Sequence, residues 1–221
     1  MDLEDLRLTI YRSFHRTGAV ASPRELADRL GVEEVELRAG LDELAAARHV
    51  VLDGSGAIVM AHPFSSVPLG FSVMGTSTLW WGGCCWDSFA LAHLLSDEPD
   101  VLVATRCPGC DRPGAWVVDR HEPPIDDVWL AHFLVPVVRI WDDVVHACGN
   151  QRLFCSRACI DGWLAGHGHD EGYVMDLATL WHLASRWYEG RLERGYQRRD
   201  PVTAAAYFRE VGLVDPFWGT A

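Results

Sequence analysis

The spacing of apolar positions predicts that the chain begins with helices. Residues 3–17 place apolar side chains at the interval of one helical face, namely Leu3, Leu6, Ile10, Tyr11 and Phe14. The stretch Ser22-Pro23-Arg24-Glu25 predicts a second helix start, with Ser22 as N-cap, Pro23 as first helical residue and Glu25 as capping-box partner. Gly31 ends that helix, and VEEVELRAGLDELAAARH predicts a third.

Two short β-prone runs then flank Asp53-Gly54-Ser55-Gly56 and predict a hairpin. Three helices and a hairpin have the outline of a winged-helix-like domain, which we place at residues 1–62. Its third helix would be the one that reads DNA. Residues 1–62, however, carry seven arginines against eleven acids, a net charge of −4, and a DNA-binding surface needs the opposite sign. We therefore interpret this domain as structural or dimerising, so that a homodimer is possible and no nucleic acid is expected.

The next segments alternate between extended and helical patterns. Residues 63–79 have extended character and are interpreted as a connector, and residues 80–175 contain all the cysteines. After WWGGCCWD the sequence predicts a short buried helix, followed by the β-prone runs DVLVAT, AWVVD, WLAHFLVPVVRIW and DVVHA. A further helix is predicted over 157–166.

The C-terminal residues 176–221 are predicted to form a helical tail, with helices over 176–195 and 201–212. The arginines between 186 and 199 alternate with Glu189 and Glu193, a pattern typical of a solvated helix face. The predicted fold class is therefore α+β: a helical N-terminal domain, a β-rich cysteine domain and a helical tail.

Composition and charge exclude several function classes. Apolar residues make up 49% of the 221 residues, which is ample for a core, and no apolar run reaches the length of about 18 residues that a membrane helix needs. The amphipathic start MDLEDLRLTIYRSF lacks the features of a signal peptide, so we expect a cytoplasmic protein without a membrane partner. The net charge of −12 also disfavours nucleic acid.

The absence of lysine is informative. All 19 cationic side chains are arginine, which excludes Schiff-base chemistry and a P-loop lysine. The seven cysteines are an odd number and all lie between residues 84 and 159. In a reducing compartment, this pattern favours thiol chemistry or metal binding over a disulfide framework.

The first candidate site is Cys84-Cys85-Trp86-Asp87. Gly82-Gly83 permits a tight turn, after which Cys84 would stand at a helix start, where the helix dipole favours a thiolate. Asp87 follows Cys84 by three residues and would share its face, whereas Cys85 would point elsewhere. The alternative is that both cysteines are small core residues.

These motifs resemble those of the organomercurial (alkylmercury) lyase family. The stretch Cys84-x-x-Asp87 is similar to the family's first active-site motif. Asp143 to Cys148, followed by Leu153-Phe154 and then Asp161-Gly162-Trp163-Leu164, resembles the segment that carries its second catalytic cysteine. Arg106-Cys107 is similar to a further family cysteine. The resemblance covers residues 1–175, but Cys85 has no counterpart, Gly149 stands where the family has a cysteine, and the tail lies outside it.

The resemblance implies an enzyme that cleaves a carbon–mercury bond by protonolysis. Cys84 and Cys148 would be the two thiolates that hold mercury(II), a soft cation that selects such ligands, and Asp87 would carry the proton. Cys85, Trp81 and Trp86 would line the substrate pocket. Low-molecular-weight thiols or a dithiol acceptor would remove the metal ion, and no organic cofactor is expected.

Two other functions stay open. The cysteines could belong to a carrier or sensor for copper(I) or mercury(II) without turnover, or to a winged-helix regulator that uses them as its sensor. The acidic third helix disfavours the regulator.

The remaining cysteines form a second candidate site. Cys107-Pro108-Gly109-Cys110 is a CxxC motif on a turn, and Cys155 and Cys159 open a helix about 45 residues later. Two such pairs match the four thiolates of a structural zinc site. Unpaired core cysteines or a redox pair are the alternatives.

Overall fold

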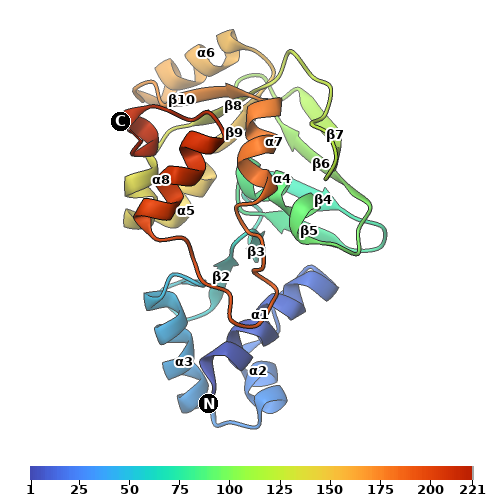
Figure 1. The fold of residues 1–221 in the computed structure, drawn as a ribbon, viewed down its shortest axis with the longest axis vertical. Helices are drawn as coiled ribbons and strands as arrows, with labels where there is room; N and C mark the ends of the chain where they lie inside the picture. Colours follow the sequence, from blue (N-terminus) through green and yellow to red (C-terminus); the bar gives the residue numbers. More distant parts are fainter. Residues whose placement is uncertain (221) are drawn as a thin grey trace.

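The computed structural model describes residues 1–220, and it combines helices and strands in the α+β class that the sequence predicts. At the N-terminus, α1 (Leu3–Thr17), α2 (Pro23–Leu30) and α3 (Glu34–Ala46) pack together (Figure 1). Ser22 caps α2, and both hydrogen bonds of its capping box with Glu25 are present. Gly18 and Gly31 end the first two helices in the left-handed conformation.

Within residues 1–220 the larger sheet has seven strands in the order β1-β2-β3-β5-β4-β6-β7, and every neighbouring pair is antiparallel. Its strands are β1 (Val51–Leu52), β2 (Ile58–Ala61), β3 (Phe64–Ser65), β4 (Phe71–Met74), β5 (Leu79–Gly82), β6 (Asp100–Arg106) and β7 (Pro113–Asp119). The predicted hairpin is β1–β2, and β2 continues through β3 into the main sheet. Residues 63–79, predicted as an extended connector, carry β3 and β4 inside this sheet.

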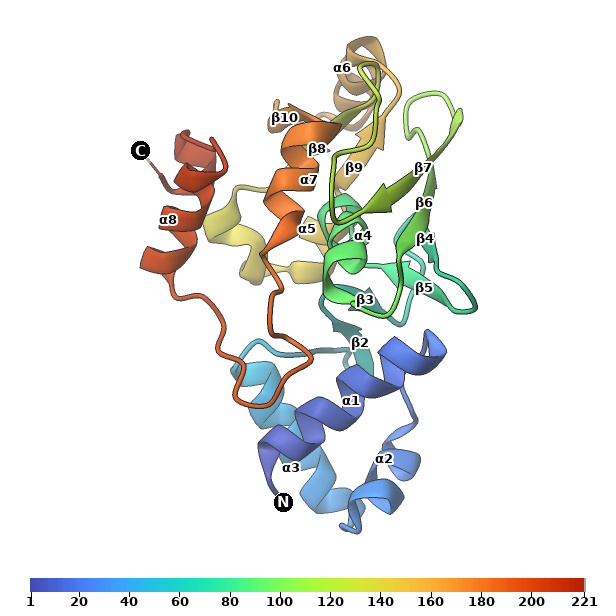
Figure 2. The ribbon, with the colours of Figure 1, turned by 45° about the vertical axis from the view of Figure 1, so that its right-hand side comes forward.

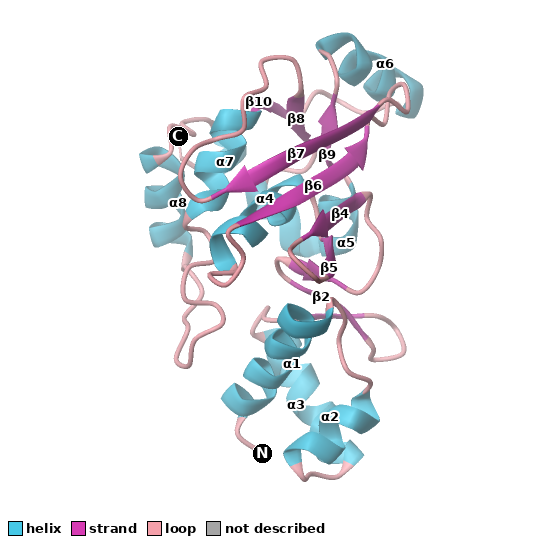
Figure 3. Ribbon diagram, turned by 90° about the vertical axis from the view of Figure 1, so that its right-hand side faces the viewer, coloured by secondary structure: helices cyan, strands magenta, loops and turns pink. Residues whose placement is uncertain are grey.

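A smaller sheet has the order β10-β8-β9, from β8 (Leu130–Phe133), β9 (Gln151–Phe154) and β10 (Tyr173–Asp176). Figure 3 shows the two sheets as separate groups of strands. The predicted strand run through VPVVRIW and DVVHA is instead helical, as η1 (Val137–Asp142) and α5 (Val144–Gly149). The Asp143 side chain accepts a hydrogen bond from the backbone N–H of His146 and so caps α5. This contact stabilises the start of a helix and has no equivalent in a strand.

Helix α4 (Cys85–Leu94) lies in the centre of the larger body. Residues 85–92 are all buried, since the helix is apolar on every face, and it contacts strands β4–β7, β9 and helix α7 (Leu177–Ser185). Helix α6 (Arg157–His167) packs on β9. Within residues 1–220, no helix is long and apolar enough to span a membrane.

The tail does not form the predicted helix over 176–195. Helix α7 ends at Ser185, and the chain then descends to α1 and returns to α8 (Pro201–Glu210) and η2 (Pro216–Trp218), as Figures 1 and 2 show. Gly190 and Gly195 have φ angles of +75° and +82°, which only glycine adopts easily. We call residues 186–200 the tail loop.

Candidate active site

A partly open cavity of about 90 Å³ lies where α4, α5 and the tail loop meet. Its lining brings together the three residues that the sequence singles out for catalysis, Cys84, Asp87 and Cys148. All three are buried, with at most 3% of their surface exposed. Cys148 therefore shares one small cavity with residues that precede it by 61 and 64 positions in the sequence.

The start of α4 positions two of these groups. Cys84 is the N-cap, and its sulfur accepts the backbone N–H of Asp87 at 3.4 Å. Ser88 donates its hydroxyl to the carbonyl of Cys84 at 2.6 Å, which fixes the turn. A Cβ at Gly83 would lie 2.3 Å from Oδ2 of Asp87, so only glycine leaves room for the carboxyl.

The Asp87 carboxyl has one close partner. Tyr188 of the tail loop donates its hydroxyl to Oδ1 at 2.5 Å, whereas Oδ2 has no hydrogen-bond partner among residues 1–220. Burial raises the pKa of Asp87 to about 7, and the hydrogen bond from Tyr188 opposes this rise. A carboxyl with this pKa can both accept and return a proton at neutral pH.

The two thiols are protonated at rest. Burial, followed by the interaction with Cys148, raises the pKa of Cys84 well above its usual value. The expectation that Cys84 is a thiolate at the helix start is therefore wrong, because loss of solvation raises its pKa. For Cys148, the hydrogen bond with Cys84 lowers the pKa, but burial and the Asp87 charge outweigh it and leave the pKa raised.

His62, which follows β2, completes the group. Its Nε2 lies 3.4 Å from Sγ of Cys148 and 4.0 Å from Oδ2 of Asp87. Burial lowers the pKa of His62 to about 3, so the ring is neutral and its Nε2 can share a hydrogen bond with the thiol. One ligand atom from each of His62, Asp87 and Cys148 lies within 4.8 Å of the others, a grouping that could hold a metal ion.

The predicted pocket residues are only partly brought together. Trp86 lines the cavity and packs against Trp187 of the tail loop, with ring centroids 4.7 Å apart and the ring planes tilted by 47°. Cys85 is fully buried but does not line the cavity, and Trp81 lines a different hollow, beside Phe71 and Arg152. Adjacent residues at a helix start point about 100° apart, which explains why Cys84 and Cys85 diverge.

Sequence reasoning missed several lining residues, namely His62, Trp141, Trp187, Tyr188, Arg191, Tyr196, Arg198 and Arg199. Most of these come from the tail loop. The interpretation of its arginines as a solvated helix face is wrong for Arg191, which is 3% exposed. The one available signal was the dense aromatic and arginine content between residues 186 and 199, which is unusual for a solvent-facing helix.

The other four cysteines also converge. One sulfur from each of Cys107, Cys110, Cys155 and Cys159 lies within 4.8 Å of the others, with Cys110 and Cys155 at 3.4 Å and Cys155 and Cys159 at 3.6 Å. The backbone N–H of Cys155 points to the sulfur of Cys107 at 3.4 Å. Four ligands about 2.3 Å from a tetrahedral zinc ion would be about 3.8 Å apart, so the cluster has suitable dimensions.

Comparisons with known proteins agree with the fold and the first motif. The sequence model of the alkylmercury lyase family (MerB) matches residues 64–189, which include Cys84, Asp87 and Cys148. The structure is similar to the crystal structure of the mercury-bound form of MerB2, with a TM-score of 0.62 and 17% sequence identity. That match covers 87% of this chain and 99% of the other. Among curated proteins, no sequence matches this chain.

The fold is of the α+β class, and one cavity in it holds two thiols and a carboxyl. The family match spans more than half of the chain and contains the predicted catalytic residues. The chain therefore belongs to the alkylmercury lyase family, and its enzyme class is that of a carbon–metal bond lyase.

Proposed function

We propose that this protein protonolyses the carbon–mercury bond of an organomercurial, using Cys84, Cys148 and Asp87. The observation that carries the proposal is that two buried thiols share one cavity with a carboxyl whose pKa is about 7. In the balanced reaction, R–Hg–X and two thiols give R–H, a mercury ion held by two thiolates, and HX. The Hg–C bond, the Hg–X bond and two S–H bonds break, while one C–H bond, one H–X bond and two Hg–S bonds form. No oxidant or reductant is consumed.

The resting protonation states suit this reaction. Neutral thiols bring both protons that the products need, and mercury displaces them because its affinity for thiolate sulfur is high. Asp87 receives one proton and returns it to the carbon as the Hg–C bond breaks, and this transfer needs the carboxyl within hydrogen-bond reach. Oδ2, which has no partner among residues 1–220, is the oxygen available for the transfer.

His62 and Tyr188 orient the reacting groups. The His62 ring holds the Cys148 thiol through a contact of 3.4 Å, and Tyr188 holds Oδ1 so that Oδ2 is left for the proton transfer. Trp86, Trp141 and Trp187 surround these groups with apolar surface, which excludes water that would otherwise compete for the metal. Low-molecular-weight thiols then remove the mercury ion, in a cytoplasm that keeps both cysteines reduced.

We further propose that Cys107, Cys110, Cys155 and Cys159 bind a structural zinc ion. The sulfur spacing supports this, as does Gly109, where a Cβ would lie 2.7 Å from the carbonyl of Cys159 and push the two motifs apart. The backbone N–H of Arg112 lowers the pKa of Cys110 to about 7, which favours the thiolate that zinc requires.

The test of the lyase proposal is the release of methane or benzene from methyl- or phenylmercury in excess thiol. We expect the wild type to release hydrocarbon, and Cys84→Ser and Cys148→Ser each to abolish it. Asp87→Asn should still bind the metal but release hydrocarbon about 10²- to 10⁴-fold more slowly, the usual worth of a positioned proton carrier.

Cys85→Ala is the matched control, because Cys85 is adjacent in sequence but lies outside the cavity lining. It should keep turnover. If it loses as much activity as Cys84→Ala, the vicinal pair is the functional unit. Tight metal binding without hydrocarbon from any variant would instead favour the non-catalytic soft-metal carrier, which the grouping of His62, Asp87 and Cys148 could also serve.

A further inference from the structure

The arginines of the cavity lack carboxylate partners. Arg191, Arg198 and Arg199 all line it, and within residues 1–220 none of them forms a salt bridge. The salt bridges in this part of the chain use other arginines, at positions 7, 106, 139, 157, 186 and 194. Three guanidinium groups without a carboxylate partner among residues 1–220 thus border one cavity in a protein of net charge −12.

The N–H groups of these arginines are largely free. Arg191 donates Nε to the Tyr11 hydroxyl at 3.1 Å, and Arg199 donates Nη2 to the carbonyl of Arg186 at 3.0 Å. Nε of Arg199 is buried without a partner, and the Arg198 side chain makes no hydrogen bond with residues 1–220. Since each guanidinium carries five N–H groups, most of the donors have no protein acceptor.

Aromatic stacking holds the guanidinium groups in place but gives their N–H groups no hydrogen-bond acceptor. Arg198 lies over the Trp141 ring at 4.9 Å, and Arg199 lies over the Tyr207 ring at 4.6 Å. Stacking uses the face of a guanidinium and leaves its edge donors for a planar acceptor. A purely structural role would explain the stacking, but it would not explain why the unpaired edges border the cavity.

The charges are also unbalanced. Asp87 is the one acidic residue among those that line the cavity, and its pKa of about 7 leaves it only partly ionised. Burial, together with the positive charges of Arg191 and Arg48, lowers the pKa of Arg198. A bound anion would relieve this repulsion.

We infer that the substrates are organomercurials that carry a carboxylate, either on the organic group or on the thiol bound to mercury. This inference rests on the lyase function proposed above. Cys84, Asp87 and Arg191 are buried, whereas Arg198 and Arg199 are partly exposed and therefore mark the outer part of the site. The mercury end meets the two thiols, and the carboxylate accepts hydrogen bonds from the free guanidinium N–H groups of Arg198 and Arg199.

The experiment compares four combinations. The organic group is 4-mercuribenzoate or phenylmercury, and the excess thiol is mercaptoacetate or 2-mercaptoethanol. Release of benzoate or benzene gives kcat/KM for each. A preference for 4-mercuribenzoate in 2-mercaptoethanol assigns the recognised carboxylate to the organic group, and a preference for phenylmercury in mercaptoacetate assigns it to the thiol ligand.

The variants are Arg198→Gln with Arg199→Gln, Arg198→Lys, and Arg24→Gln as a control that removes a positive charge from the exposed surface of α2. We expect the wild type to prefer at least one carboxylate combination about tenfold, and the double variant to lose that preference, because it removes charge-assisted hydrogen bonds. Arg198→Lys should keep part of the preference for the carboxylate combination, and Arg24→Gln should keep the whole preference.

Equal kcat/KM for all four combinations, or an unchanged preference in the double variant, overturns the inference. If no combination releases hydrocarbon, the proposed lyase function fails instead. The inference is then tested by the apparent Kd of 4-mercuribenzoate and phenylmercury, from tryptophan fluorescence in the same thiols, with Cys84→Ser to define binding at the cavity. We expect the wild type to bind at least one carboxylate combination about tenfold more tightly and the double variant to lose this difference. Equal Kd values for all combinations overturn the inference.

Discussion

At the scale of single residues, the chemistry of the site depends on solvation more than on the helix start. Burial raises the pKa values of Cys84 and Asp87 and lowers that of His62. Cys84 and His62 are therefore uncharged at neutral pH, and Asp87 is only partly ionised. The Tyr188 hydroxyl is the contact that keeps the pKa of Asp87 from rising further.

Tyr188→Phe should move the ionisation of Asp87 to higher pH. The hydroxyl stabilises the carboxylate, so its loss favours the protonated form. A hydrogen bond to a charged group contributes about 1.5–3 kcal/mol, which corresponds to about 1 to 2 pH units. The measurement is the pH dependence of kcat, in which the relevant ionisation is the one that disappears in Asp87→Asn.

Tyr196→Phe is the matched control, because Tyr196 lines the same cavity without a hydrogen bond to Asp87. Its profile should keep the wild-type midpoint. A Tyr188→Phe midpoint that stays in place or moves to lower pH would show that the hydroxyl does not stabilise the carboxylate.

At the scale of elements, the four-cysteine cluster joins segments that hydrogen bonds alone connect weakly. Cys107 and Cys110 lie in the turn between β6 and β7, and Cys155 and Cys159 lie at the junction of β9 and α6. The first pair belongs to the larger sheet and the second to the smaller one. Zinc at this point would hold the two sheets together, close to β9, whose residue Gln151 lines the cavity.

Purified protein should hold one zinc ion per chain by elemental analysis, and Cys110→Ser with Cys155→Ser should lose it. A tightly bound ion at a hundred times its Kd stabilises the folded state by about 2.7 kcal/mol, so Tm should fall by roughly 5–10 °C. Thermal unfolding with and without a chelator measures the difference.

Cys85→Ala serves as the control, since it removes a thiol outside the cluster, and it should keep the zinc content of the wild type. Protein that folds to the same Tm in chelator and carries no zinc would leave the four thiols as core residues or as a redox pair.

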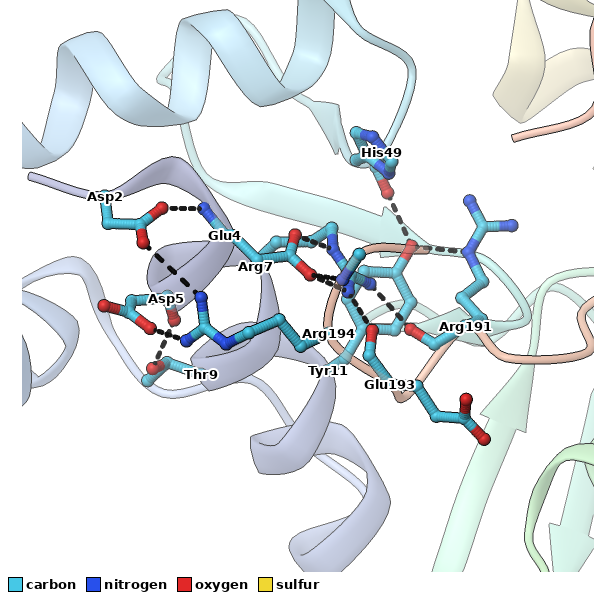
Figure 4. A network of polar contacts seen from close by, with 11 residues as sticks. Asp2, Glu4, Asp5, Arg7, Thr9, Tyr11, His49, Arg191, Glu193 and Arg194 are labelled. Atoms are coloured by element: carbon cyan, nitrogen blue, oxygen red, sulfur yellow. Dashed lines mark hydrogen bonds and ion pairs between the residues drawn. The ribbon is translucent and has the colours of Figure 1, made fainter. Parts of the chain in front are cut away.

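At the scale of the whole molecule, the tail loop connects the N-terminal helices to the cavity. The buried Arg7 of α1 donates to the carbonyls of Arg191 and Glu193, each at 2.6 Å, and its guanidinium also pairs with Glu4 (Figure 4). Tyr188 and Arg191 therefore reach the cavity from a segment that α1 holds in place. This gives the N-terminal domain a role in building the site.

Arg7→Gln should lower both stability and activity. The substitution leaves the Glu4 carboxylate without its ion-pair partner and two backbone carbonyls without their donor. Removing one partner of a buried ion pair lowers the free energy of unfolding by about 3 kcal/mol. Tm should fall by about 6–12 °C, and kcat/KM should fall because Tyr188 and Arg191 lose their support. Thermal unfolding and hydrocarbon release measure the two effects.

Arg194→Gln is the comparison, because Arg194 joins the same loop to Asp2 and Asp5 but its side chain is 58% exposed. Exposed pairs contribute about 0–1 kcal/mol. Equal losses in the two variants would mean that burial of Arg7 does not matter for the attachment of the loop.

The sequence by itself determined the features that lie within a helical turn or a short motif. It placed Cys84 and Asp87 on one helix start, separated Cys85 from them, capped α2 with Ser22, and paired the CxxC motif with a second cysteine pair. It also marked Cys148 as the second thiol through the family resemblance. Such features depend on local spacing, which periodicity and turn chemistry express directly.

Only the tertiary structure decided how those residues behave. His62 and Tyr188 lie 22 residues before Cys84 and 101 residues after Asp87, and no local pattern links them to the site. The arginines of the tail loop alternate with acids as on a solvated helix, yet Gly190 and Gly195 let the chain turn and bury Arg191. The pKa values follow from burial, because solvation depends on atoms that packing brings from distant segments.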